Sequence, residues 1–303
     1  MPDFFKHVLN TGILDMIENP DQEDDELGPR FRGANTPLLD GDSFLTDGES
    51  HCPRVAILRK RGISSKPSPK NILSWTYGRA WEALMKQMVD KAKIPNLSYL
   101  EEEQCAVLIY DDSGERLIYS ARPDLLISYN DKKFPVECKS IQSNNGALNI
   151  FTHNKPKLGA LLQLCMAMQA HDCQTGYTLY GLMHWVNGYD FSTRSGFKCE
   201  PDFATQFAEF RDDGFMYSNG RKTCVSYERC LNGIHALDQL DAAGIFLPER
   251  PKGVDMFGNA MKYNCCTYCP YNMICSQYGP KDSIQIDEFI EEVKLEVDVY
   301  VRA

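Results

Sequence analysis

Two acidic residues and a lysine form the pattern in this sequence with the clearest chemistry. Asp124 opens an apolar segment, and Glu137 and Lys139 lie in the next one, after the turn-forming residues NDKK. A tight hairpin would bring Asp124 beside Glu137, while strand alternation would place Glu137 and Lys139 on one face. Two adjacent carboxylates repel unless a cation lies between them, and Mg²⁺ prefers carboxylate and water oxygens. The pattern predicts a hard-metal site, although ordinary charges on a solvated hairpin would have the same spacing.

Such a site suits hydrolysis of a phosphoester. A divalent ion polarises a phosphoryl oxygen and lowers the pKa of a bound water. Lys139, on the same face, would orient that water or stabilise the charge that develops on phosphorus oxygens. We expect a helix carrying Glu82 before the hairpin and a helix carrying Gln163 after it.

A second group of residues with metal-binding chemistry lies near the C-terminus. Cys266, Cys269 and Cys275 have the spacing C-x2-C-x5-C, which leaves a tetrahedral thiolate site one ligand short. The fourth ligand must come from elsewhere, and Cys265 could replace Cys266. Thiolates suit both Zn²⁺ and iron–sulfur clusters, so the residue types alone do not decide between them.

Charge is distributed unevenly along the chain. The net charge is −10, but residues 51–100 contain 10 basic and 2 acidic side chains, whereas residues 1–50 contain 3 basic and 12 acidic ones. A locally basic segment can bind a polyanion, because binding responds to local potential; a solvated basic face is the alternative. The candidate DNA-binding residues are Arg54, Arg59, Lys60, Arg61, Lys155 and Lys157.

The elements that position these residues alternate between helix and strand, which predicts a mixed α/β fold. We expect a largely irregular acidic leader over residues 1–50, a core over 51–280 and an acidic tail over 281–303. Trp75 and Trp81 are interpreted as core residues rather than base-stacking platforms. Helices are predicted over 74–92, with Ser74 as N-cap, over 155–171, and over parts of 202–213 and 223–242; strands are predicted over 105–110, 116–121, 124–130, 134–141 and 175–186.

Taken in order, these motifs resemble the RecB-type branch of the PD-(D/E)XK nucleases. The resemblance rests on Gly78 to Glu82, Pro123-Asp124, Glu137-Cys138-Lys139 and Gln163. Some members, including the CRISPR-associated iron–sulfur exonucleases and the AddB nuclease domain, hold a [4Fe–4S] cluster with one early cysteine in a C-P-R context and three late ones. Cys52, in HCPR, has that context and supplies the missing fourth cysteine.

The resemblance implies a restriction-endonuclease-like core with a mixed central sheet flanked by helices and an iron–sulfur subdomain formed from both flanks. It implies a Mg²⁺- or Mn²⁺-dependent deoxyribonuclease, an exonuclease acting on single-stranded or frayed DNA ends, with a helicase, recombinase or CRISPR integrase as partner. The implied metal ligands are Glu82, Asp124, Glu137 and the backbone carbonyl of Cys138; Lys139 and Gln163 would position water and phosphate; the cluster ligands would be Cys52, Cys266, Cys269 and Cys275.

Two positions depart from the family pattern. Ala167 stands where the glutamine motif usually has a tyrosine, which puts that residue's contact with the substrate strand in doubt. Glu82 stands where many iron–sulfur members have histidine; glutamate is a competent ligand for a hard metal.

Other classes of function are weighed against this one. A non-catalytic iron–sulfur protein for DNA binding or assembly in recombination or CRISPR adaptation is the main alternative, and a zinc-stapled interaction domain is another. The chain has no G-x4-G-K-(S/T) motif, so any unwinding would come from a partner. With no secretory signal and no apolar run of membrane-spanning length, we expect a cytoplasmic protein with reduced cysteines and no membrane contact.

Overall fold

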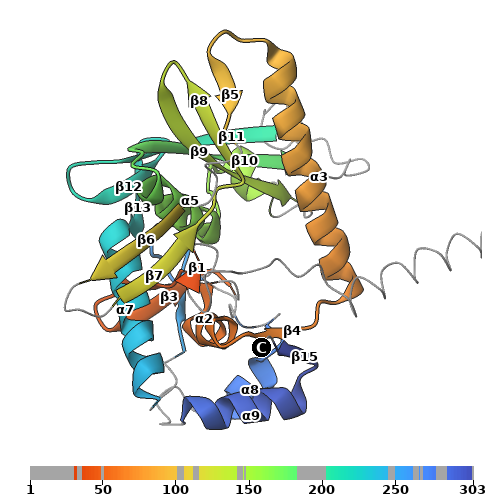
Figure 1. Cartoon of the computed structure of the whole chain (residues 1–303), viewed down its shortest axis with the longest axis vertical. Helices are drawn as coiled ribbons and strands as arrows, with labels where there is room; N and C mark the ends of the chain where they lie inside the picture. Colours follow the sequence, from red (N-terminus) through yellow and green to blue (C-terminus); the bar gives the residue numbers. More distant parts are fainter. Residues whose placement is uncertain are drawn as a thin grey trace, which may run out of the picture.

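The chain folds as a mixed α/β protein around one large sheet (Figure 1). The computed structural model describes residues 31–32, 36–48, 51–100, 106–111, 116–141, 146, 148–182, 203–244, 250–261, 266, 269–277 and 285–301. The prediction of a mixed central sheet flanked by helices is confirmed at this level.

The central sheet has seven strands in the order β13-β12-β11-β10-β9-β8-β5. β9 and β10 are parallel, and the other neighbouring pairs are antiparallel. A parallel pair requires a crossover connection, and helix α5 lies in it. The strands are β5 Leu97–Tyr99, β8 Leu125–Tyr129, β9 Lys132–Ile141, β10 Thr175–Leu182, β11 Phe203–Phe210, β12 Phe215–Ser218 and β13 Arg221–Ser226.

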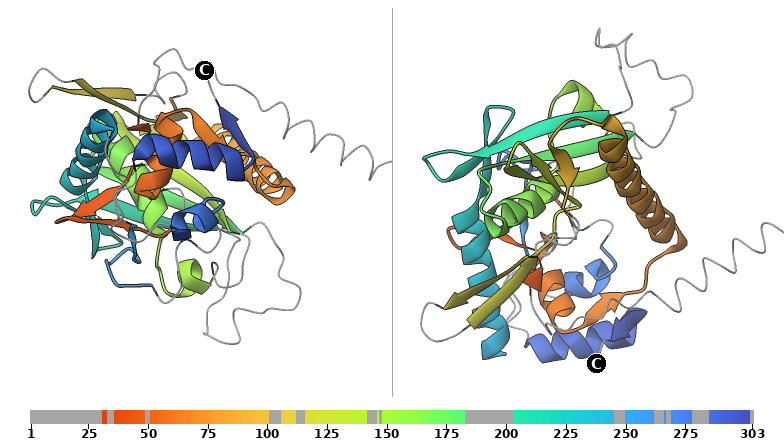
Figure 2. Two further views of the ribbon diagram at one scale, coloured as in Figure 1. Left: turned by 90° about the horizontal axis from the view of Figure 1, so that it is seen from below. Right: turned by 45° about the horizontal axis from the view of Figure 1, so that its top comes forward.

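Two helices pack on opposite faces of the sheet beside β9 and β10 (Figure 2). Helix α3, Pro69–Ala92, places Trp81 over Gly181, where an added Cβ would lie 2.4 Å from the indole ring. Helix α5, Leu158–Ala170, packs on the other face, where Tyr180 is fully buried. Neighbouring strand residues point to opposite faces of the sheet. Gly181 therefore packs against α3, and Tyr180 packs against α5.

The cysteine-bearing segments gather at one end of the molecule (Figures 1 and 2). There β4, Ile63–Ser65, pairs with β15, Val299–Val301, so segments from both ends of the described chain are hydrogen-bonded. The helices at this end are α2 Pro53–Lys60, α8 Asn272–Gln277 and α9 Ile286–Glu296; a further long helix, α7 Tyr227–Ala243, covers the side of the molecule.

The acidic tail is part of the core. Its helix α9 buries Ile286, Phe289, Ile290 and Val293, while its charged residues face outward. This amphipathic pattern explains why a segment that is acidic by composition packs against the protein. The boundary expected at residue 281 therefore does not separate residues 285–301 from the fold.

Part of the acidic leader is also structured. Residues 1–30 lie outside the described part of the chain, but Leu38, Phe44 and Leu45 are buried in the main core. They belong to β2 and β3, and Asp40 pairs with Arg229 of α7 at 2.6 Å. The expected irregular conformation does not hold for residues 38–46. Two small three-stranded sheets complete this part of the fold. Their strand orders are β1-β7-β6 (Phe31–Arg32, Arg116–Ala121, Ala106–Asp111) and β14-β3-β2 (Lys252–Gly253, Ser43–Thr46, Leu38–Asp40).

Two sequence-based expectations about elements are corrected. Residues 203–210, expected to be helical, form strand β11 between β10 and β12. Helix α3 begins at Pro69 rather than at residue 75, with Ser68 as its N-cap: the Ser68 hydroxyl accepts a hydrogen bond from the Asn71 N–H at 3.2 Å. Pro69 at the first helical position lacks the N–H that a helix start leaves unpaired. A short π-helix of 5 residues, η3 Leu148–Thr152, precedes α5.

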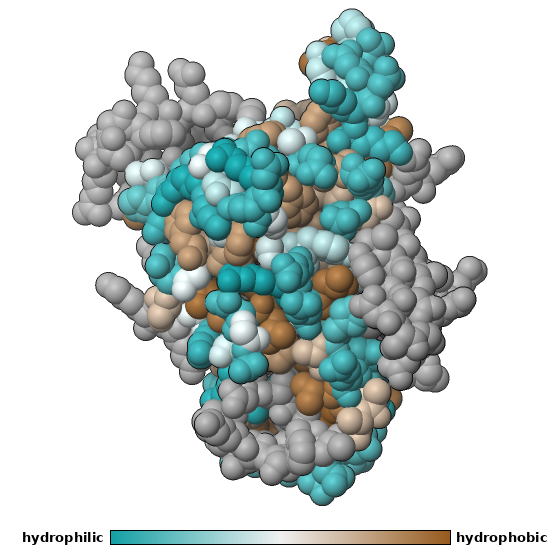
Figure 3. Space-filling view, turned by 90° about the vertical axis from the view of Figure 1, so that its left-hand side faces the viewer, coloured by the Kyte–Doolittle hydropathy of each residue, from teal (hydrophilic) through white to brown (hydrophobic). Residues whose placement is uncertain are grey.

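The face formed around α7 is a mixed polar surface, with apolar side chains in patches between hydrophilic ones (Figure 3). Among the described helices, none combines the length and the apolar composition needed to cross a membrane.

Candidate functional site

The hairpin of β8 and β9 brings the predicted acidic pair together. In its register Leu125 lies opposite Val136, so Asp124, one residue before β8, reaches Glu137. An Asp124 carboxylate oxygen accepts a hydrogen bond from the Cys138 backbone N–H at 2.7 Å. The Lys139 ammonium contacts the Glu137 carboxylate and lies 3.9 Å from Asp124. The predicted proximity of these side chains is confirmed.

The carboxylates perturb one another strongly. Burial, and then the charge of Asp124, raise the pKa of Glu137 to about 8, which Lys139 only partly offsets. Burial and Asp124 also raise the pKa of Glu82, against the opposing effect of Lys86. Burial alone would lower the pKa of Lys139, but Glu137 and Asp124 raise it above its usual value. Lys139 therefore remains an ammonium ion near neutral pH.

The donor set fits a hard divalent cation. Three carboxylates, of Glu82, Asp124 and Glu137, lie within one electrostatic neighbourhood, and the most buried of them carries an unfavourable charge that a cation would stabilise. In the described part of the chain, no three His, Cys, Asp or Glu side chains already surround a common point.

The remaining predicted residues of this site have distinct environments. The Cys138 side chain is buried with Trp81 and Met85, and its backbone N–H orients Asp124. The prediction that the Cys138 carbonyl is a metal ligand stays a prediction. Gln163 lies on α5, and its buried Oε1 has no hydrogen-bond partner among the described residues. The described contacts include none between Gln163 and Lys139. Ala167 is buried, so no side chain at this position reaches a substrate.

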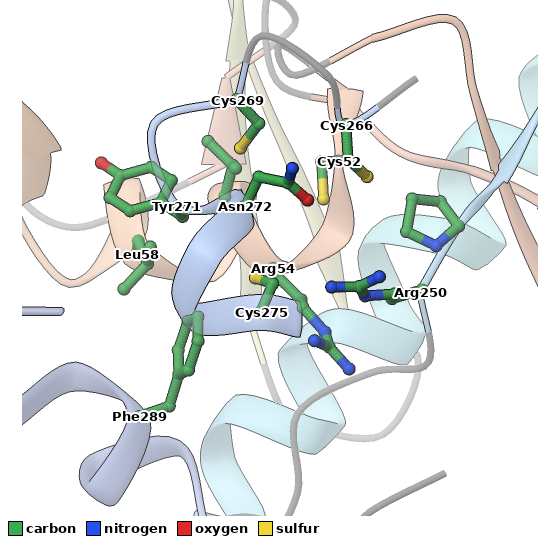
Figure 4. A pocket seen from close by; sticks show the side chains of 12 residues that line it. Cys52, Arg54, Leu58, Arg250, Cys266, Cys269, Tyr271, Asn272, Cys275 and Phe289 are labelled. Atoms are coloured by element: carbon green, nitrogen blue, oxygen red, sulfur yellow. The ribbon is translucent and has the colours of Figure 1, made fainter. Parts of the chain in front are cut away.

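The four cysteines of the second site come together, as the sequence predicts. Cys52 precedes α2, Cys266 and Cys269 lie in the approach to α8, and Cys275 lies on α8; all four surround one small cavity (Figure 4). The turn is closed by hydrogen bonds from the Cys269 N–H to the Cys266 carbonyl at 3.0 Å and from the Asn272 N–H to the Cys269 carbonyl at 3.1 Å. Cys265, the alternative ligand, lies outside the described residues.

Two arginines share this cavity, and sequence reasoning missed their role. Arg54, expected to contact DNA, is only 2% exposed and lies against Cys275. Arg250 lies in the same cavity and also interacts with Cys275 (Figure 4). Burial raises the pKa of Cys275, and a hydrogen bond from Arg54 opposes this. Burial also raises the pKa of Cys52, to about 11.

The four cysteines line one cavity, although among the described residues they do not stand close enough together to form a metal site as they are. Soft sulfur donors from four cysteines are the ligand set of both tetrahedral zinc and iron–sulfur clusters. Two adjacent guanidinium groups would offset the negative charge of four ligated thiolates, because charge-assisted hydrogen bonds stabilise a buried anion. This environment supports metal ligation, and it gives a reason for an arginine directly after Cys52-Pro53.

The basic segment is largely paired inside the protein. Lys60 lies 2.5 Å from Asp238 and 2.9 Å from Asp241, and Arg61 lies 2.7 Å from Asp241. Both acids belong to α7, so Lys60 and Arg61 join α2 to α7 rather than forming an open positive strip. Together with buried Arg54, this removes three of the predicted DNA contacts.

A polar group near the start of α5 lies between the two sites. His51 is buried, and its Nδ1 lies 3.0 Å from the Thr36 carbonyl oxygen. The Asp47 carboxylate accepts a hydrogen bond from the Gly159 N–H at 2.9 Å. Desolvation lowers the pKa of Lys157, Asp47 opposes this, and nearby Lys139 lowers it further. Of the predicted DNA contacts, Lys157 is the one that lies close to Lys139.

His51 and Asp47 could not have been found from local spacing, because they are joined to the site only through α5. Arg59 is partly buried and influences the titration of His51, while Lys155 is half-buried with its N–H bonded to the Asn149 carbonyl. Arg122 is exposed and close enough to Glu82 to lower its pKa. The basic groups nearest the carboxylates are thus Lys86, Arg122, Lys139 and Lys157.

No protein-family model matches the sequence, and no curated protein matches it. A solved structure titled "Crystal structure of SSO0001" is similar to the chain, with a TM-score of 0.45 and 15% sequence identity over 90% of this chain and 97% of that chain. A match at this level assigns neither a family nor a function.

Proposed function

We propose that the protein is a metal-dependent DNA nuclease with a PD-(D/E)XK core and a [4Fe–4S] site held by Cys52, Cys266, Cys269 and Cys275. The observation that carries the proposal is the convergence of Glu82, Asp124 and Glu137 beside Lys139, from a helix and a hairpin. A carboxylate cluster with a neighbouring ammonium group on a strand is an arrangement that can hold a divalent ion for hydrolysis of a phosphodiester.

Each residue has a separate task in this proposal. Glu82, Asp124 and Glu137 would hold Mg²⁺ or Mn²⁺, which supplies a polarised phosphate and a water of lowered pKa. The Cys138 N–H fixes Asp124, and Lys139 stabilises the negative charge on the phosphate oxygens. Lys157, near Lys139, and Arg122, near Glu82, would contact phosphates of the bound strand. The buried Oε1 of Gln163 would accept a hydrogen bond from a water at the site.

The iron–sulfur site has a structural task. Cys52 precedes α2, and the other three cysteines belong to the α8 region, so ligation would fasten two distant parts of the chain at one end of the fold. The anaerobic protein should be brown and contain about four iron and four sulfide per chain. A colourless protein with one zinc per chain would instead support a zinc-stapled domain.

Asp124→Asn tests the nuclease proposal. The asparagine oxygen can keep the hydrogen bond from Cys138, but the negative charge is lost. Cleavage of 5′- and 3′-labelled single strands with Mg²⁺ or Mn²⁺ should fall by at least 10²-fold, as expected when one preorganised electrostatic group is lost. EDTA should stop the unchanged protein.

Asp131→Asn is the matched control. Asp131 lies at the far turn of the same hairpin with a φ of 64°, a conformation that asparagine adopts readily. This variant should cleave normally, and both variants should keep their iron. Undiminished cleavage by Asp124→Asn would place the active site elsewhere, and absence of cleavage by every form would favour the non-catalytic alternative.

A further inference from the structure

Helix α3 exposes an aromatic side chain that the fold does not use. Only Ile72, Trp81 and Met85 of its 24 residues are buried. Trp81 is in the core, as the sequence predicts, but Trp75 is 54% exposed, against the same prediction. Tryptophan is a large apolar group, and α3 leaves other large apolar side chains exposed as well, namely Leu73, Tyr77, Leu84 and Met88. The helix therefore presents uncovered apolar surface beside a charged site.

Trp75 lies on the face of α3 that carries Glu82. The two residues are seven apart, which in an α-helix is about 20° around the axis and about 10 Å along it. Arg79 and Lys86 belong to the same face, four residues after Trp75 and Glu82 respectively. The buried residues Trp81 and Met85 lie on a different face. One side of the helix thus carries an exposed indole, basic groups and a predicted metal ligand.

This combination matches the chemistry of single-stranded nucleic acid. Such strands bind through bases stacked on aromatic rings and phosphates held by basic side chains. A separation of about 10 Å corresponds to about three nucleotides of a stacked strand. Arg79, one turn from the indole, adds a positive charge that suits a phosphate backbone better than an apolar protein segment. Lys86 lies further along the helix, where it pairs with Glu82 at 3.6 Å.

We propose that Trp75 is a base-stacking platform for the single strand that enters the carboxylate site. The inference rests on the proposed nuclease function and names its substrate class: a strand with unpaired bases about three nucleotides from the bond that is cleaved. Base stacking contributes about 1–3 kcal/mol per base and tolerates any sequence, because every base has a flat apolar face. Trp75 also supplies an aromatic strand contact, which the family pattern would place at Ala167.

The test measures binding separately from cleavage. Fluorescence anisotropy of a labelled oligothymidylate, in EDTA so that the probe is not consumed, gives the dissociation constant of the full-length anaerobic protein. Trp75→Ala should weaken binding by about 5- to 150-fold, and Trp75→Phe should retain most of the affinity. An abasic strand of the same length should bind the unchanged protein and Trp75→Ala equally, because it has no bases to stack.

Leu73→Ala is the matched control. Leu73 is 45% exposed at nearly the same height of α3, about 200° away around the axis. Its removal should not change binding. Equal affinity of Trp75→Ala and the unchanged protein would overturn the inference and leave Trp75 to a protein partner. An equal loss on the abasic strand, or an equal loss in Leu73→Ala, would also overturn it.

The failure of this inference and the failure of the proposed nuclease can be told apart. The binding measurement needs no catalysis, and the Asp124→Asn experiment needs no contribution from Trp75. Iron content and the urea midpoint of Trp75→Ala should equal those of the unchanged protein, because an exposed side chain contributes little to the core.

Discussion

Replacement of Glu137 by glutamine should alter how the stability of the metal-free protein depends on pH. Glu137 is 3% exposed and adjoins Asp124, and these surroundings raise its pKa from 4.5 to about 8. Glutamine has the size and hydrogen-bonding pattern of the protonated acid but cannot ionise. The substitution therefore imitates the low-pH state of this one residue at every pH.

The sign follows from proton linkage. A group whose pKa is higher in the folded state contributes stability below its unfolded value, and that stability is lost as pH rises through the folded value. The free energy of unfolding should thus fall between pH 5 and 8 because Glu137 must ionise inside the protein. A shift from 4.5 to about 8 corresponds to about 5 kcal/mol at 1.36 kcal/mol per unit.

Urea unfolding in EDTA at pH 5, 6, 7 and 8 measures this contribution. Glu137→Gln should match the unchanged protein near pH 5 and exceed its stability by a few kcal/mol at pH 8. Lys139 does not interfere, because its pKa is raised and it stays charged throughout this window. Mg²⁺ should restore the unchanged protein at pH 8 but not the variant. Parallel pH profiles for the two proteins in EDTA would show that Glu137 titrates normally and would refute the reasoning.

Three further predictions concern the surrounding structure. Gly181→Ala should lower the urea midpoint by an amount equivalent to about 1–3 kcal/mol, because its Cβ would lie 2.4 Å from the Trp81 ring; an unchanged midpoint would contradict this contact. Asp241→Asn should destabilise the protein by about 1–3 kcal/mol, since it breaks the pair with Lys60, and should leave the salt dependence of DNA binding unchanged; a changed salt slope would mean that this basic segment touches phosphate. Cys275→Ser should lose iron on purification and unfold at lower urea, whereas full iron content would exclude Cys275 as a ligand.

The acidic pair could be predicted from the sequence because its geometry is local. The residues between Asp124 and Glu137 contain a turn signal between two apolar segments, and a hairpin of that length fixes which residues face each other. Glu82 lies in another element, helix α3. Its place in the site was predicted from the family resemblance and not from its spacing to Asp124. The four cysteines were likewise predicted as one site by the motif order.

The edges of the fold were harder to predict. Strand β11 has alternating small, polar and aromatic residues, FATQFAEF, which fit a strand with one face on the protein as well as an amphipathic helix. Its pairing with β10 decides the matter, and that pairing depends on residues far away in the sequence. Leu38 and Phe44 lie among acidic residues, and composition over 50 residues conceals two short buried strands.

The basic segment shows why counting charges along the chain does not predict where positive charge is exposed in the fold. Lys60 and Asp238 are 178 residues apart, so the segment is basic in sequence but paired in space. Arg54 is basic and buried, a combination that no local pattern indicates. The partners of both residues are set by tertiary packing, and the positive potential that remains near the carboxylates comes from residues scattered over several elements.

The two sites are connected through one packed contact. His51 directly precedes Cys52, and its ring lies so close to Gly159 that a Cβ there would be 2.8 Å from Nε2. Gly159 belongs to the first turn of α5, whose next residues carry Gln163 toward the sheet, and the charge of Lys139 reaches His51. Cys52 is the residue next to His51, so a displacement at Cys52 would press His51 against the start of α5. Packed interiors have little free space to absorb such a displacement, and this contact is therefore a physical route from the cysteine cavity to the helix that carries Gln163.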